Sequence, residues 1–126
     1  MSATDTWPGT VELAATAGRV VRELNHRTRG ADAVNGPAEL YRLVGELVVL
    51  GRGLPQLLTQ LGCWLHAEHD AGRVRSDNHA DPGPAVCRAT AHMVDAGDAA
   101  SDLAHALDRA QQHLAHLGAT PTDRAT

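Results

Sequence analysis

The stretch of sequence that decides the fold runs from residue 85 to residue 118 and reads AVCRATAHMVDAGDAASDLAHALDRAQQHLAHLG. Apolar residues recur in it at alternating intervals of three and four, a spacing that brings side chains onto one face of an α-helix. That row consists of Val86, Ala89, Met93, Ala96, Ala100, Leu103, Leu107, Ala110, Leu114 and Leu117. The opposite face is polar and includes Asp95, Asp102 and Arg109. We therefore predict a helix over about 84–117 that packs through this row.

A second helix is predicted over about 37–71, because its leucines repeat every seven residues in adjacent columns. Pro37 suits a first helical position, and Gly72 follows the last one. The columns are Leu40, Leu47, Leu54 and Leu61; Leu43, Leu50, Leu57 and Trp64; and Val44, Gly51, Leu58 and Leu65. Pro55 lies in the middle and lacks a backbone N–H, which predicts either a kinked helix or two helices nearly end to end.

A shorter helix over about 10–29 is predicted at the N-terminal end, where Leu13, Val20 and Leu24 supply an apolar stripe that stops at Gly30. The loop after Gly72 would join the two long helices into an antiparallel hairpin. The fold class is therefore all-α, a three- to four-helix bundle with the short helix alongside the hairpin. We expect a single domain over 1–126, with a mobile tail at 119–126.

The composition agrees with an all-α domain and narrows the function. The chain has 126 residues, of which 43% are hydrophobic and only 2% aromatic, without any Phe. Sheets favour aromatic and β-branched residues, so a β-sandwich or barrel is excluded. A net charge of −4 disfavours non-specific binding of nucleic acid. The sequence has neither a leader-like start nor an apolar run long enough to span a membrane, which predicts a cytoplasmic protein without membrane contact.

The leucine content predicts contact with another chain. Two long helices and one short helix cannot cover this much apolar surface, so a homodimer or higher homo-oligomer is expected, and a different protein partner is possible. Tyr41, Val48 and Val49 lie on the otherwise polar side of the second helix, where either the first helix or another subunit could pack. The predicted interface residues are Tyr41, Leu43, Val48, Val49, Leu50 and Leu57.

Two alternative functions rest on polar side chains. Arg19, Arg22 and Arg29 share one face of the first helix with His26, and a basic helical face can contact nucleic-acid phosphates. An acidic row on the third helix offers these arginines a partner within the protein instead.

A group of histidines near the turn provides the second alternative, which is metal binding. Its members are His66, His69 and His92. Imidazoles three residues apart on a helix can share an ion, but no recognised ligand motif surrounds them.

Catalysis has no support in the sequence. Cys63 and Cys87 lie in no nucleophile motif, and no glycine-rich phosphate loop is present, so we expect neither enzymatic activity nor a cofactor. The prediction is a non-catalytic interaction or assembly protein that self-associates through helix faces rich in leucine and alanine.

Overall fold

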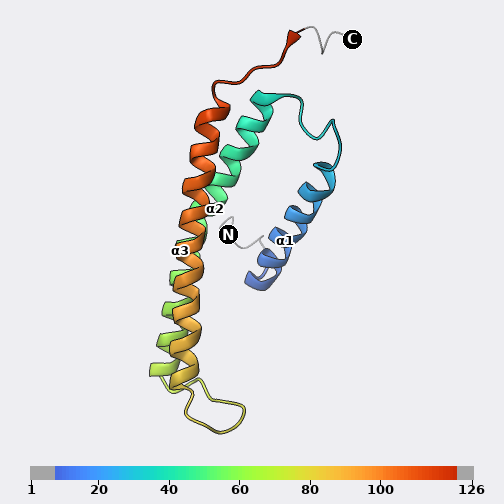
Figure 1. Ribbon diagram of the computed structural model, residues 1–126. Helices are drawn as coiled ribbons and strands as arrows, with labels where there is room; N and C mark the ends of the chain where they lie inside the picture. Colours follow the sequence, from blue (N-terminus) through green and yellow to red (C-terminus); the bar gives the residue numbers. More distant parts are fainter. Residues whose placement is uncertain (1–7, 122–126) are drawn as a thin grey trace, which may run out of the picture. The chain divides into compact units, whose positions relative to one another are not determined.

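A computed structural model describes residues 8–121 and contains three helices within that range. They are α1 (Thr10–Arg27), α2 (Pro37–Asp70) and α3 (Gly83–Leu114), shown in Figure 1. No strand occurs among residues 8–121, so the all-α prediction is confirmed. Each helix begins and ends within three residues of its predicted bounds. Residues 122–126 of the expected mobile tail lie outside the described range, and its mobility stays a prediction.

The chain divides into two units, which are described separately. One unit contains α1 and continues to Gly36, and the other contains α2 and α3. The single domain and the packing of the short helix beside the hairpin therefore stay predictions. Within residues 8–121, no helix has the length and hydropathy that a membrane span requires.

α1 is an amphipathic helix that ends two residues earlier than the sequence predicted. The Thr28 backbone N–H and its hydroxyl both donate to the Leu24 carbonyl oxygen, at 3.0 and 2.8 Å. These two bonds satisfy a carbonyl that would otherwise lack a partner at the helix end. Arg29 consequently lies beyond the last turn of α1, and helical spacing no longer fixes its position relative to Arg19 and Arg22.

α2 runs without a break through Pro55, which decides between the two possibilities that the sequence left open. The helix ends at Gly72, whose φ of +76° is accessible to glycine at little cost. There the Arg73 N–H donates to the Glu68 carbonyl at 2.9 Å and the Gly72 N–H to that of His69 at 3.0 Å, a Schellman motif. The Arg73 side chain also donates to the Glu68 carboxylate, which raises the pKa of the guanidinium.

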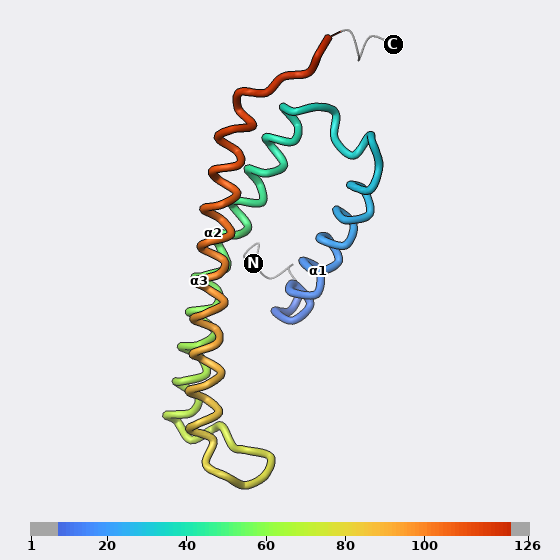
Figure 2. Tube along the Cα trace, viewed as in Figure 1, coloured from blue at the N-terminus to red at the C-terminus, as the bar shows by residue number. Residues whose placement is uncertain are grey.

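The chain then reverses direction through residues 71–82 and enters α3 (Figure 2). At the start of α3, the Asp81 carboxylate accepts a hydrogen bond from the Gly83 N–H at 3.0 Å. This bond satisfies one of the free amides at the start of the helix, which need such acceptors.

α2 and α3 pack along each other in opposite directions, as their paired positions show. A Cβ built on Gly51 would lie 3.3 Å from the Ala104 Cβ, and one on Gly62 would lie 3.8 Å from the Thr90 Cγ2. One built on Gly97 would lie 3.6 Å from the Cα of Pro55. Residue numbers rise along one helix as they fall along the other, so the two helices are antiparallel.

Small residues form the line of contact between the helices. Val48, Gly51 and Gly62 of α2 are buried, as are Val86, Gly97, Ala100 and Ala104 of α3. Absent or short side chains let two helix backbones approach closely. We call this line of buried residues the small-residue seam.

On α3, every second residue of the predicted apolar row lies in the contact with α2. At the other positions the residue in contact is the next one along the chain. Val86 and Ala100 are buried as expected, but Gly97 and Ala104 are buried in place of Ala96 and Leu103. The reason is steric: Gly97 faces Pro55 and Ala104 faces Gly51, and neither approach would leave room for a leucine. Leu103 is consequently 48% exposed.

Candidate functional site

The two sides of the α2–α3 pair differ in chemistry, and the seam defines them. Residues one position after a seam residue of α3, namely Cys87, Asp98 and Ser101, line a groove together with Thr59, Cys63 and His66 of α2. Residues one position before a seam residue, such as Ala96 and Leu103, must therefore lie on the opposite side, because one residue turns a helix by about 100°. The same reasoning places Leu50 and Leu61 of α2 on that opposite side, and Leu57 lies two helical turns from Leu50 in the same column.

Large apolar side chains are exposed on this second side. Exposed fractions there range from 42% for Leu61 to 63% for Trp64. We define the leucine face as Leu50, Leu57, Leu61, Trp64 and Leu103. Leucine and tryptophan are ordinarily among the most buried residues, so a row of them on one face marks a candidate interaction surface.

The predicted interface residues do not share one surface. Val48 is only 3% exposed and belongs to the small-residue seam, so it packs between the helices of one chain. Leu50 and Leu57 belong to the leucine face, and Leu43 is half-buried two turns before Leu50. Val49 is exposed on another side of α2, because it is turned by about 100° from either neighbour.

Tyr41 is exposed near the start of α2, and its backbone takes part in pairing with α3. Its carbonyl oxygen accepts a hydrogen bond from the Gln111 Nε2 at 3.3 Å. A Cβ built on Gly45 would lie 2.5 Å from that same Nε2, so glycine at this position makes room for the bond. Tyr41, Val48 and Val49 therefore do not form the single patch that the sequence suggested. Val48 belongs to the seam, whereas Tyr41 and Val49 are exposed outside it.

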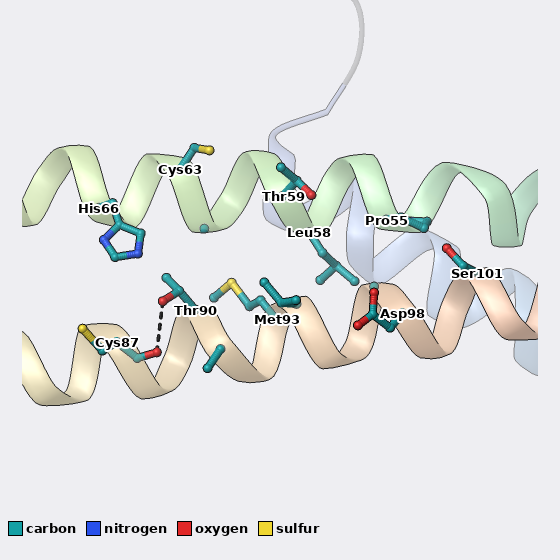
Figure 3. A pocket seen from close by; sticks show the side chains of 14 residues that line it. Pro55, Leu58, Thr59, Cys63, His66, Cys87, Thr90, Met93, Asp98 and Ser101 are labelled. Carbon is teal, nitrogen blue, oxygen red and sulfur yellow. Dashed lines mark hydrogen bonds between the residues drawn. The ribbon is translucent and has the colours of Figure 1, made fainter.

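The groove on the other side of the pair has a volume of about 480 Å³. Figure 3 shows Leu58 and Met93 in its middle, His66 and Cys87 toward one end, and Asp98 and Ser101 toward the other. Both cysteines are free and exposed, and both line it. The sequence analysis missed this site, although Gly62 and Gly97, which line it without a side chain, were a signal for it.

The proposed metal ligands are not brought together. His66 lines the groove, whereas the Nδ1 of His92 lies 3.9 Å from the Asp95 Oδ2 on the surface of α3. In the part of the chain from residue 8 to residue 121, no three His, Cys, Asp or Glu residues are placed to hold a metal ion. The geometry therefore gives His66, His69 and His92 no support as a shared site.

The basic residues of the first unit are partly engaged within α1. The Arg19 Nη2 donates to the Thr16 hydroxyl at 2.9 Å, and the Arg27 Nε donates to the Glu23 Oε1 at 2.9 Å. The predicted nucleic-acid stripe of Arg19, Arg22 and Arg29 is shortened, since Arg29 follows the end of the helix. Two arginines on the helix remain as candidates for phosphate contact.

Comparison of the sequence with protein-family models, with curated proteins and with solved structures finds no match.

Proposed function

We propose that this protein is a non-catalytic helical assembly protein that self-associates through the leucine face. The observation that carries the proposal is the exposure of Leu50, Leu57, Leu61 and Trp64, at 42–63%, along one side of α2. A half-exposed leucine gains roughly 1 kcal/mol when its remaining apolar surface leaves water.

The α2 part of the leucine face follows two of the leucine columns, and every residue in these two columns between Leu43 and Trp64 is apolar. The columns are Leu43, Leu50, Leu57 and Trp64, and Leu47, Leu54 and Leu61. At 1.5 Å per residue this stretch is roughly 32 Å long, and two adjacent helices are about 20 Å wide. That footprint approaches the roughly 800 Å² per partner that a standard protein–protein interface buries.

The proposed occupant of this surface is a second copy of the chain. The α2 part presents leucines, whereas the α3 part beside it presents Ala96, Ala99 and Ala106, which are small and exposed. A two-fold axis would lay the leucines of one copy over the alanines of the other, and large side chains pack well against small ones. The proposed assembly is a four-helix bundle made from two antiparallel α2–α3 hairpins, and its proposed location is the cytoplasm.

The experiment compares two substitutions that both add a carboxylate at an exposed apolar position. Leu50→Asp introduces the charge on the leucine face, and Val94→Asp introduces it on the groove side, where Val94 is 61% exposed. The particle mass of each variant is measured by light scattering coupled to size exclusion. We expect Leu50→Asp to reduce the mass to that of one chain, because a charge buried without a partner is costly. Val94→Asp should retain the mass of the unaltered protein.

Circular dichroism of both variants verifies that the helices are retained. Self-association through this face would be contradicted if Leu50→Asp kept both the mass and the melting temperature of the unaltered protein. Equal loss of mass in both variants would also contradict it, because the leucine face would then have no special role.

A further inference from the structure

The groove between α2 and α3 is a candidate ligand site that the assembly function does not use. It lies on the side of the pair away from the leucine face, so it stays open whether or not two copies associate. Its volume of about 480 Å³ lies within the range of small-molecule sites, roughly 300–1,000 Å³.

Two glycines of the small-residue seam lie along the groove. Gly62 and Gly97 are among its lining residues, and Cβ atoms built on them would make ordinary contacts at 3.8 Å with Thr90 and at 3.6 Å with Pro55. Because neither residue has a side chain, nothing projects from these two positions into the groove.

The middle of the groove is apolar. Leu58 of α2 and Met93 of α3 both extend into the space between the two helices (Figure 3), and Pro55 and Val94 continue the apolar lining. The Thr90 hydroxyl donates to the Val86 and Cys87 carbonyls of its own helix, at 3.0 and 3.1 Å. With its hydroxyl engaged there, Thr90 places its methyl group near Gly62. This lining suits a hydrocarbon chain.

Charge in the groove has one sign. Asp98 is the only carboxylate among the lining residues, and no arginine lines the groove. In the described residues, no hydrogen bond or ion pair engages Asp98. Ser101 lies one turn further along α3 and adds a hydroxyl that can accept a hydrogen bond. A ligand with a positively charged donor group would complement this end.

The shape of the groove favours a long ligand over a compact one. Its lining on α3 extends from Cys87 to Ser101, which corresponds to roughly 21 Å at 1.5 Å per residue. We propose that the groove binds an elongated apolar amine, with its hydrocarbon chain along Leu58 and Met93 and its ammonium group beside Asp98. Such a ligand places its charge beside Asp98 and its apolar part along the apolar lining.

The test uses n-decylamine below its micellar concentration, with n-decanol and n-decanoate as neutral and anionic probes of the same length. Binding is followed by two-dimensional NMR of the ¹⁵N-labelled full chain, at the amide signals of Gly62, Gly97 and Asp98. We expect decylamine to shift these signals in a saturable way and to bind more tightly than decanol, with decanoate weakest. Because Asp98 is exposed, the preference for the amine should be roughly two- to five-fold.

Charge reversal provides the decisive comparison. Asp98→Arg should transfer the preference from decylamine to decanoate, whereas Asp102→Arg makes the same change of charge one turn away, outside the groove. Both positions are exposed on α3, so both variants should keep the fold. The Asp102→Arg variant should keep the order of affinities of the unaltered protein.

Three results would overturn the proposal. The first is equal affinity for the three probes, which would mean that Asp98 selects nothing. The second is a set of shifts centred on Leu57 and Trp64, which would place the hydrocarbon chain on the leucine face. The third is an equal effect of Asp98→Arg and Asp102→Arg. Ligand binding can be measured equally well on Leu50→Asp, even if that variant no longer self-associates. Failure of the ligand proposal is therefore distinguishable from failure of the assembly proposal.

Discussion

On one side of α2 small residues are buried, and on another side large apolar residues are exposed. On the side toward α3, Gly51 and Val48 are buried, and Ala104 opposite them is only 1% exposed. Along the leucine face, Leu50 and Trp64 remain 48% and 63% exposed. Close approach of two backbones requires small residues, whereas large ones need a partner surface to fill. The comparison shows that this chain forms its helix pair with glycine and alanine and keeps its leucines for another contact.

The largest effect should come from breaking the small-residue seam. Ala104→Leu would force a branched side chain against Gly51, where the Ala104 Cβ already lies 3.3 Å from a built Cβ. We expect the free energy of unfolding to fall by about 3 kcal/mol, which is the upper range for overpacking a tight core. Urea denaturation followed by circular dichroism measures the change.

His105→Leu is the control, since His105 is exposed next to Ala104 on the same helix and belongs neither to the leucine face nor to the groove lining. Its effect on stability should remain within about 0.5 kcal/mol, as for most surface substitutions. Equal destabilisation by the two variants would show that the seam is not where α2 and α3 meet.

The second prediction concerns the leucine face itself. Leu57→Ala removes an exposed side chain that the proposed dimer buries, so it should weaken association roughly ten-fold while the helices of each chain stay paired. Val94→Ala removes a side chain of similar exposure from the groove side and should leave association unchanged. Sedimentation velocity over a dilution series measures both. A larger effect of Val94→Ala than of Leu57→Ala would show that two copies meet on the groove side and not through the leucine face.

A smaller effect is expected where α2 ends. Gly72 has a φ of +76°, a conformation that disfavours any residue with a Cβ. Gly72→Ala should therefore lower the free energy of unfolding by about 1 kcal/mol, measured by urea denaturation. Gly118→Ala is the control, because a Cβ there meets nothing within 4 Å and no positive φ is involved. An unchanged stability in Gly72→Ala would contradict the role assigned to this helix end.

The smallest predicted change compares two glycines of the seam. Gly62→Ala adds a Cβ at an ordinary 3.8 Å from Thr90, so higher helix propensity should stabilise the protein by about 0.5–1 kcal/mol. Gly51→Ala adds one at 3.3 Å from Ala104, and crowding should cancel that gain. Differential scanning calorimetry should give the higher melting temperature to Gly62→Ala. The opposite ranking would show that the helices approach more closely at Gly62 than at Gly51.

The sequence predicted the helices well because their ends carry local signals. Pro37 can begin a helix and Gly72 can end one whatever the rest of the chain does. The seam was harder to predict, because small or apolar residues occupy two adjacent rows of α3. Ala96 and Gly97 fit a seven-residue repeat equally well, and only the approach of Pro55 favours Gly97.

The candidate surfaces were predicted only in part, for a similar reason. Leu50 and Leu57 stood out by size, and they do lie on an exposed face. Val48 and Val49 are neighbours in sequence but face different surroundings, which hydrophobicity alone cannot distinguish. The groove is lined by residues of both helices, Gly62 and Gly97 among them, so it is defined only when the two helices are paired.

We propose that one copy of the chain leaves the leucine face exposed for a second copy. Sedimentation equilibrium of the unaltered protein over a wide range of concentrations measures whether the second copy binds. The mass should rise with concentration to twice the 13.3 kDa of one chain or beyond. A mass of one chain at every concentration would mean that the leucine face does not bind a second copy.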